Sequence, residues 1–170
     1  MKSRLLIVVL LFSAILSCQS NYERDAQKVK DAILRYNQLL AEGYAKMNMN
    51  PLQEVATAEH ATKLYYHMAA LGEAKVRLES ELKNIEFLNM KFNDSRNVTV
   101  STRETWDFSH VNYNTQKIEL QEKGFVYELT YELTKKDDRW LVKGVTAVER
   151  KSSVKKGNKE KEGQQSSQER

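Results

Sequence analysis

Side chains able to bind a metal or act as a nucleophile are scarce in this 170-residue chain, which contains one cysteine, Cys18, and three histidines. His60 and His67 are seven residues apart in a segment with helical periodicity. Seven residues span about 10.5 Å along a helix, too far for two imidazoles to share one zinc ion at ~2.1 Å. Both histidines lie opposite the apolar stripe on a helical wheel, so we expect them to face solvent or an interface. The spacing predicts no metal site.

Acid–base chemistry would need a carboxylate or a histidine in a pocket, and Glu104, Asp107 and His110 are the candidates. Asp107 alternates with Trp106 and Phe108 along an extended segment, so we expect its carboxylate to point away from the apolar layer. The chain contains no Gly-x-Ser-x-Gly elbow, glycine-rich phosphate loop, Cys-x-x-Cys pair or His-Glu-x-x-His sequence. We therefore predict no catalytic residue and no cofactor. An enzyme that uses one of the three candidates is the alternative.

The first residues are typical of an export signal. Lys2 and Arg4 precede an apolar run over 5–16, and Cys18 follows closely. As a helix the run covers about 18 Å, less than the ~30 Å hydrocarbon core of a bilayer, which favours a signal peptide over 1–17 rather than a transmembrane anchor. The alternatives are a secretory signal with an incidental cysteine and an uncleaved signal anchor.

The sequence Ile-Leu-Ser-Cys over 15–18 resembles the lipobox of bacterial lipoproteins. The resemblance implies that the signal is removed, that Cys18 carries palmitate or similar acyl chains, and that 18–21 form a short lipidated linker. Two or three acyl chains hold a protein on a bilayer, whereas one chain binds reversibly. Gln19, in place of aspartate, implies the outer membrane facing the periplasm if the host is Gram-negative. The expected location is the bacterial cell envelope, with the membrane as partner.

The basic character of the chain is confined to its two ends. The formal charge is +4, but 19–149 hold 18 basic and 20 acidic side chains. The excess of Lys and Arg lies in the signal and in 150–170, a polar tail that we expect to be disordered because it has few apolar residues to bury. The composition therefore predicts no nucleic-acid partner.

The first half of the mature chain has helical periodicity. Apolar residues recur every three or four positions over 22–48, which predicts one helix. Asn50 and Pro51 are typical of a helix start, and we expect a second helix from there. The apolar stripe of this helix is Val55, Ala58, Ala61, Tyr65 and Met68. Gly72 predicts a break before a shorter third helix. The apolar residues of that helix are Ala74, Leu78 and Leu82. Helices are thus expected through 22–83.

The period then changes to two, which predicts strands. The strands are expected over 86–92, 98–108, 125–134 and 140–148, with a short additional strand near 117–121. Together they form a sheet within 85–149. The expected domain, 22–149, is therefore α+β, with N-terminal helices packed on one face of a curved antiparallel sheet of about four strands.

The last hairpin, over 125–142, combines a long alternating strand, an Asp-Asp-Arg turn and Trp140 at the start of the final strand. The element order and this hairpin resemble the NTF2-like (cystatin-like, SnoaL-like) superfamily, and within it the IMS domain of ARC6-type proteins or NTF2-like lipoproteins. The resemblance implies a cone-shaped sheet whose concave face lines any pocket. Sheet tyrosines Tyr127 and Tyr131, and the pair Tyr65 and Tyr66, are interpreted as core residues, with a ligand pocket as the alternative.

These features predict a non-catalytic envelope module that binds a protein partner or a small apolar ligand. An assembly module is a further interpretation, with an interface on the face of the second helix that carries His60, Lys63 and His67. The oligomeric state stays open.

Overall fold

The computed structural model describes residues 2–148, with side chains from Asn21 onward. The helical elements are α1 (Lys2–Lys46), the 3-10 turn η1 (Asn50–Glu54) and α2 (Ala58–Glu73). The strands are β1 (Val76–Phe92), β2 (Asn97–Asn112), β3 (Ile118–Lys136) and β4 (Arg139–Ala147). They form one antiparallel sheet in the order β1-β2-β3-β4. The predicted α+β class, with helices on a four-stranded antiparallel sheet, is confirmed.

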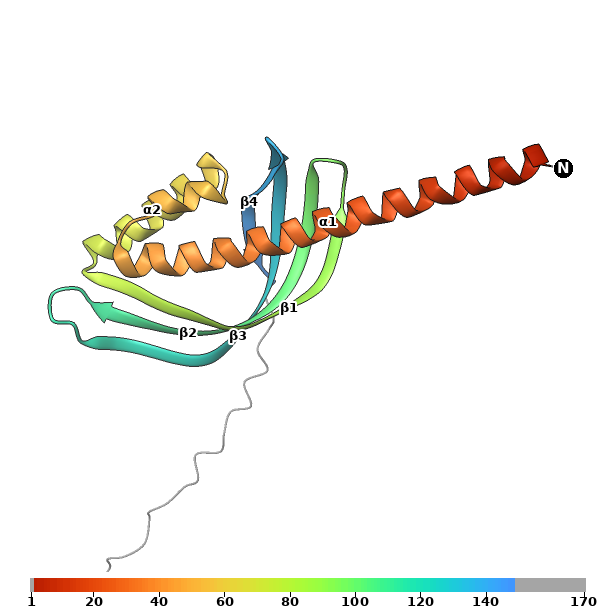
Figure 1. Ribbon diagram of the computed structural model, residues 1–170. Helices are drawn as coiled ribbons and strands as arrows, with labels where there is room; N and C mark the ends of the chain where they lie inside the picture. The colour runs from red at the N-terminus through yellow and green to blue at the C-terminus, as the bar shows by residue number, and fades with distance from the viewer. Residues whose placement is uncertain (1, 149–170) are drawn as a thin grey trace, which may run out of the picture.

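The sheet is strongly curved, and both helices lie on its concave side (Figure 1). Register shifts interrupt the pairing of β1 with β2 at two places and the pairing of β2 with β3 next to Trp106. Bulges of this kind bend a strand and increase its twist. Curvature lets strands of 16 to 19 residues wrap around the helices.

The core lies between α1 and the concave face. Val29, Ile33 and Tyr36 of α1 are buried, in agreement with the predicted helical stripe. They belong to the same apolar cluster as Val100 of β2 and Leu133 of β3. Residues two apart on the strands and three or four apart on the helix therefore meet in one layer.

The second helix begins later than the sequence predicts. Pro51 lies in η1, and α2 starts only at Ala58, with the Thr57 hydroxyl accepting a hydrogen bond from the His60 N–H. The chain between the two elements is extended, because Val55 and Thr57 exchange backbone hydrogen bonds of 2.8 and 2.9 Å with Val142 of β4. This pairing with a distant strand overrides the local helix signal.

The predicted third helix, through 74–83, is wrong. The α2 helix ends at Glu73, Lys75 adopts a positive φ of 62°, and β1 begins at Val76. Leu78 and Leu82 are four residues apart, a spacing that suits a helix and also one face of a strand. Their pairing with β2 decides the outcome.

The other strands occur where the period of two predicts them, and two of them are longer. The β2 strand continues to Asn112, and the expected short strand near 117–121 is the first part of β3, which runs unbroken to Lys136. The irregularity at 122–125 is a bulge with Gly124 at a φ of +65°.

The predicted signal segment belongs to the same uninterrupted helix as the start of the domain, since α1 runs from Lys2 to Lys46. The side chain of Cys18 and the tail over 150–170 lie outside the described part of the chain. Within the described residues, no helix is both long and apolar enough to span a bilayer.

The packing predicts that two leucines of the sheet contribute differently to the free energy of unfolding. Leu133 is 0% exposed in the core and Leu88 is 43% exposed. We expect Leu133→Ala to lower the free energy of unfolding by about 2–5 kcal/mol, because it leaves a cavity, and Leu88→Ala by well under half as much. Urea denaturation measures both. Equal losses would contradict the described sheet orientation.

Candidate functional site

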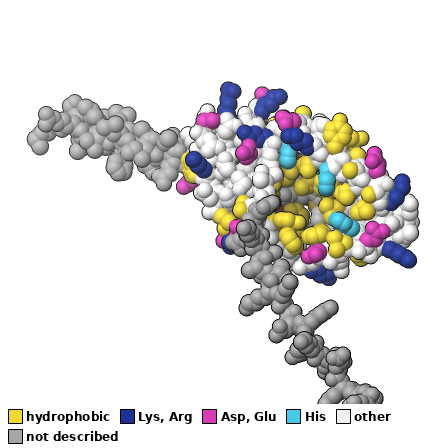
Figure 2. Space-filling view, turned by 180° about the vertical axis from the view of Figure 1, so that it is seen from behind, with side chains coloured by type: hydrophobic (Ala, Val, Ile, Leu, Met, Phe, Trp, Pro, Cys, Tyr) yellow, Lys and Arg dark blue, Asp and Glu magenta, His cyan; other side chains and the backbone are white. Residues whose placement is uncertain are grey.

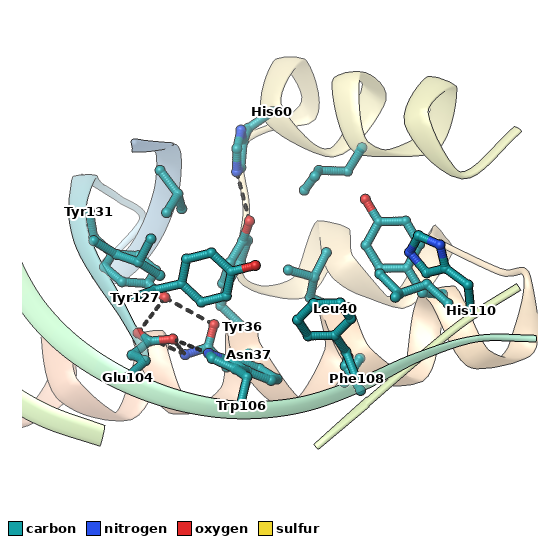
Figure 3. A pocket seen from close by; sticks show the side chains of 17 residues that line it. Tyr36, Asn37, Leu40, His60, Glu104, Trp106, Phe108, His110, Tyr127 and Tyr131 are labelled. Atoms are coloured by element: carbon teal, nitrogen blue, oxygen red, sulfur yellow. Dashed lines mark hydrogen bonds between the residues drawn. The ribbon is translucent and has the colours of Figure 1, made fainter. Parts of the chain in front are cut away.

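A cavity of about 380 Å³ lies between the helices and the concave face of the sheet. Its walls come from α1, α2 and all four strands, and most of its lining is apolar or aromatic (Figure 3). From outside, a hollow lined by hydrophobic side chains is visible, with histidines around it (Figure 2). This volume falls within the range of small-molecule pockets, roughly 300–1,000 Å³.

One carboxylate, that of Glu104, lies in the wall of the cavity and is 0% exposed. Its Oε1 accepts hydrogen bonds from the Thr102 and Tyr131 hydroxyls, at 2.9 and 2.7 Å. Its Oε2 accepts one from the Trp106 indole N–H at 2.8 Å. The Asn37 amide N–H group is 3.3 Å from both oxygens. These four neutral donors satisfy the carboxylate form, which only accepts hydrogen bonds.

The same network fixes the protonation of its tyrosine. Burial raises the pKa of Tyr131 far above its usual range, and the nearby charge of Glu104 raises it further. Tyr131 therefore keeps its proton, and its hydroxyl also lies 3.0 Å from Asn37 Oδ1. Residues of α1, β2 and β3 are thus joined at one buried point.

His60 lies inside the protein rather than facing solvent, so that prediction is wrong. It is 9% exposed, and its Nε2 shares a hydrogen bond of 2.9 Å with the Tyr36 hydroxyl. The buried face of α2 includes Ala61 and Met68 beside His60, whereas Tyr65 is 50% exposed. The helix is therefore rotated relative to the predicted stripe.

His67 is exposed, as predicted, but it is not isolated. Its Nδ1 lies 2.6 Å from the Tyr44 hydroxyl on α1. Since His60 and His67 bind different tyrosines, they do not form one site. Among the residues with described side chains, no group of three or more His, Cys, Asp or Glu residues is placed to hold a metal ion. Lys63 is exposed and pairs with Glu59 at 2.8 Å.

The three acid–base candidates do not all lie at the cavity. Glu104 and His110 line the cavity. Asp107 lies on the other face of β2, as its alternation predicts, and its Oδ1 accepts the Gly124 N–H at 2.7 Å. Glu104 is the more constrained of the two cavity groups, because both its oxygens already accept hydrogen bonds.

The four tyrosines singled out in the sequence also differ in location and burial. Tyr131 is buried in the core and Tyr127 lines the cavity. The Tyr127 hydroxyl makes no hydrogen bond with the part of the chain that the structure describes, and it points into the cavity (Figure 3). Tyr65 and Tyr66 are exposed outside this cavity, so their interpretation as core residues is wrong.

Sequence reasoning missed the contribution of α1 to the site. Tyr36, Asn37 and Tyr44 of α1 supply the partners of His60, Glu104 and His67. One signal was available, since Asn37 is a polar residue next to the apolar stripe. Its partner is 67 residues away in the chain, and only the fold brings the two together.

No family model matches the chain, and no curated protein matches its sequence. Its fold is similar to that of the intermembrane space region of the chloroplast protein ARC6, with a TM-score of 0.64 at 10% identity, covering 72% of this chain and 95% of that one. One weaker match is a periplasmic fragment of TraM, with a TM-score of 0.49 at 7% identity, covering 69% of this chain and 96% of that one. Another is an NTF-2 like protein of unknown function from Shewanella oneidensis MR-1, with a TM-score of 0.43 at 12% identity over 69% and 97%.

The ARC6 match shows a shared fold and nothing about activity. It confirms the fold that the resemblance to ARC6-type proteins implies. The fold and the site together define an α+β domain with a ligand-sized cavity on the concave side of its sheet.

The burial of His60 predicts a pH-dependent stability. Desolvation lowers its pKa below 6.5, with Lys63 acting in the same direction and Glu59 opposing, and Tyr36 is the group opposite the ring. As pH falls below about 6.5, unfolded His60 gains a proton before folded His60 does. The unfolded state then binds more protons, so we expect the free energy of unfolding to fall by up to about 1.4 kcal/mol per pH unit.

Urea denaturation between about pH 7.5 and 5.5 measures this loss. We expect His60→Asn to flatten the pH dependence in that window and the exposed-site control His67→Asn to preserve most of it. A wild-type slope that His60→Asn leaves unchanged would exclude His60 as its source.

Proposed function

We propose that this protein is a bacterial envelope lipoprotein, anchored through acylated Cys18, whose domain binds a small, largely apolar ligand without catalysis. The observation that carries the proposal is the aromatic and apolar cavity of about 380 Å³. Cores are normally packed without voids of this size, so a cavity with ordered walls is best explained by an occupant.

We propose a function without catalysis because the carboxylate of Glu104 is buried and fully hydrogen-bonded. Four donors hold its oxygens and no part of it is exposed. It therefore serves to position the walls rather than to exchange a proton with a ligand. An enzyme that uses His110 is the remaining alternative.

The anchor and the cavity are joined by a single helix. The cavity residues of α1 lie between Tyr36 and Tyr44, which are 18 and 26 residues beyond Cys18. At 1.5 Å per residue, they lie roughly 27–39 Å along the helix from the proposed anchor. The domain would stand close to the membrane, with its cavity towards the aqueous phase. In a Gram-negative host the proposed position is the outer membrane, facing the periplasm.

Ligand binding can be tested with N-phenyl-1-naphthylamine, an uncharged dye that fluoresces in apolar surroundings. The mature chain carrying Cys18→Ser is titrated in water, without detergent. We expect saturable binding that Ala41→Phe weakens at least about tenfold, because Ala41 lines the cavity and a phenyl ring would occupy it. The control Ala70→Phe places the same ring on an exposed part of α2 and should bind like the parent. Equal binding by all three proteins would contradict the proposal.

The anchor is tested by metabolic labelling with palmitate. We expect label in the parent protein and in Ser17→Ala, which keeps a small residue before the cysteine. Cys18→Ser should lose the label and retain its signal, because the thiol is the acylated group. Labelling of Cys18→Ser, or normal cleavage of its signal, would refute the anchor.

A further inference from the structure

Aromatic residues make up a large part of the cavity lining. Six of its lining residues are aromatic and come from α1, β2 and β3. They are Tyr36, Tyr44, Trp106, Phe108, Tyr127 and Tyr131. The rings of Tyr36, Trp106 and Tyr127 lie on the side of the cavity next to Glu104 (Figure 3). The face of an aromatic ring is electronegative and attracts cations.

The formal charge carried by the walls of the cavity is negative. Glu104 is the charged residue of the lining, and among the described side chains that line the cavity none is lysine or arginine. The carboxylate is held by neutral donors, and the salt bridges among described residues do not include it. Its negative charge therefore acts on the cavity without a neighbouring cation to balance it.

His60 in the wall does not cancel this charge at neutral pH. Burial lowers the pKa of His60, so its ring stays neutral beside Tyr36. His110 lines the cavity next to Phe108, with ring centroids 6.4 Å apart. The cavity thus combines six aromatic rings with one buried negative charge.

From this combination, and resting on the proposed ligand-binding function, we infer that the ligand is a soluble organic cation with a tertiary or quaternary ammonium group. An anion would approach Glu104 without a compensating positive group. A primary ammonium donates three hydrogen bonds, whereas the oxygens of Glu104 are already occupied and the Tyr127 hydroxyl offers one acceptor. A quaternary ammonium needs no acceptor and a tertiary one donates a single hydrogen bond, and both are attracted by aromatic rings and a nearby negative charge.

The matched probes are choline and 3,3-dimethyl-1-butanol, which have the same shape but differ in one positive charge. Isothermal titration calorimetry is done on the full chain in phosphatidylglycerol nanodiscs, which contribute no ammonium group, with empty nanodiscs as the blank. We expect choline to bind at least about tenfold more tightly than the alcohol. If the alcohol binds as tightly as choline, the inference is wrong.

Two variants locate the effect. We expect Tyr127→Leu to weaken choline binding about tenfold with little change for the alcohol, and the exposed-site control Tyr66→Leu to change neither. If the Glu104→Gln variant folds, its affinities for choline and for the alcohol should be similar. Unchanged choline binding in Tyr127→Leu would overturn the inference, whether or not Glu104→Gln folds.

The outcomes for the two proposals can be separated. Dye binding that Ala41→Phe abolishes, together with equal affinities for choline and the alcohol, would refute the cationic ligand and leave the proposed function standing. Lack of dye binding together with lack of choline binding would refute both.

Discussion

The structure depends on the burial of one carboxylate. Removing a carboxylate from water costs several kcal/mol, and Glu104 is fully buried. The cost is offset by donors from α1, β2 and β3, which must approach one point together. The network therefore fixes the position of α1 over the sheet, and it places the rings of Trp106 and Tyr131 in the cavity wall.

Curvature explains why a cavity exists next to this network. The bulges in β1 and β3 bend the sheet around the two helices, and long strands extend the concave face beyond the part that the helices fill. The paired side chains Tyr36 with His60 and Tyr44 with His67 join α1 to α2 across the opposite wall. Polar contacts that are satisfied within the walls leave a mainly apolar interior, which suits a ligand held by ring faces and burial.

Local patterns in the sequence predicted much of this fold. The stripe of α1 and the alternation in β2, β3 and β4 each have one periodicity that the structure follows. Leu78 and Leu82 satisfy both periods, so only their pairing with β2 could identify β1. His60 could not be placed correctly, because its partner Tyr36 is 24 residues away and α2 starts later than Pro51 suggests. Glu104 was detectable as a charged residue in phase with the inward positions of β2, but its four donors were not.

The central claim is that four neutral donors hold the buried side chain of Glu104 in its carboxylate form. The carbon-13 chemical shift of its side-chain carboxyl group, assigned by its disappearance in Glu104→Gln and recorded on the folded protein at neutral pH, tests this directly. We expect the shift of a carboxylate. A shift typical of a protonated carboxylic acid would contradict both the charge of the cavity wall and the account built on it.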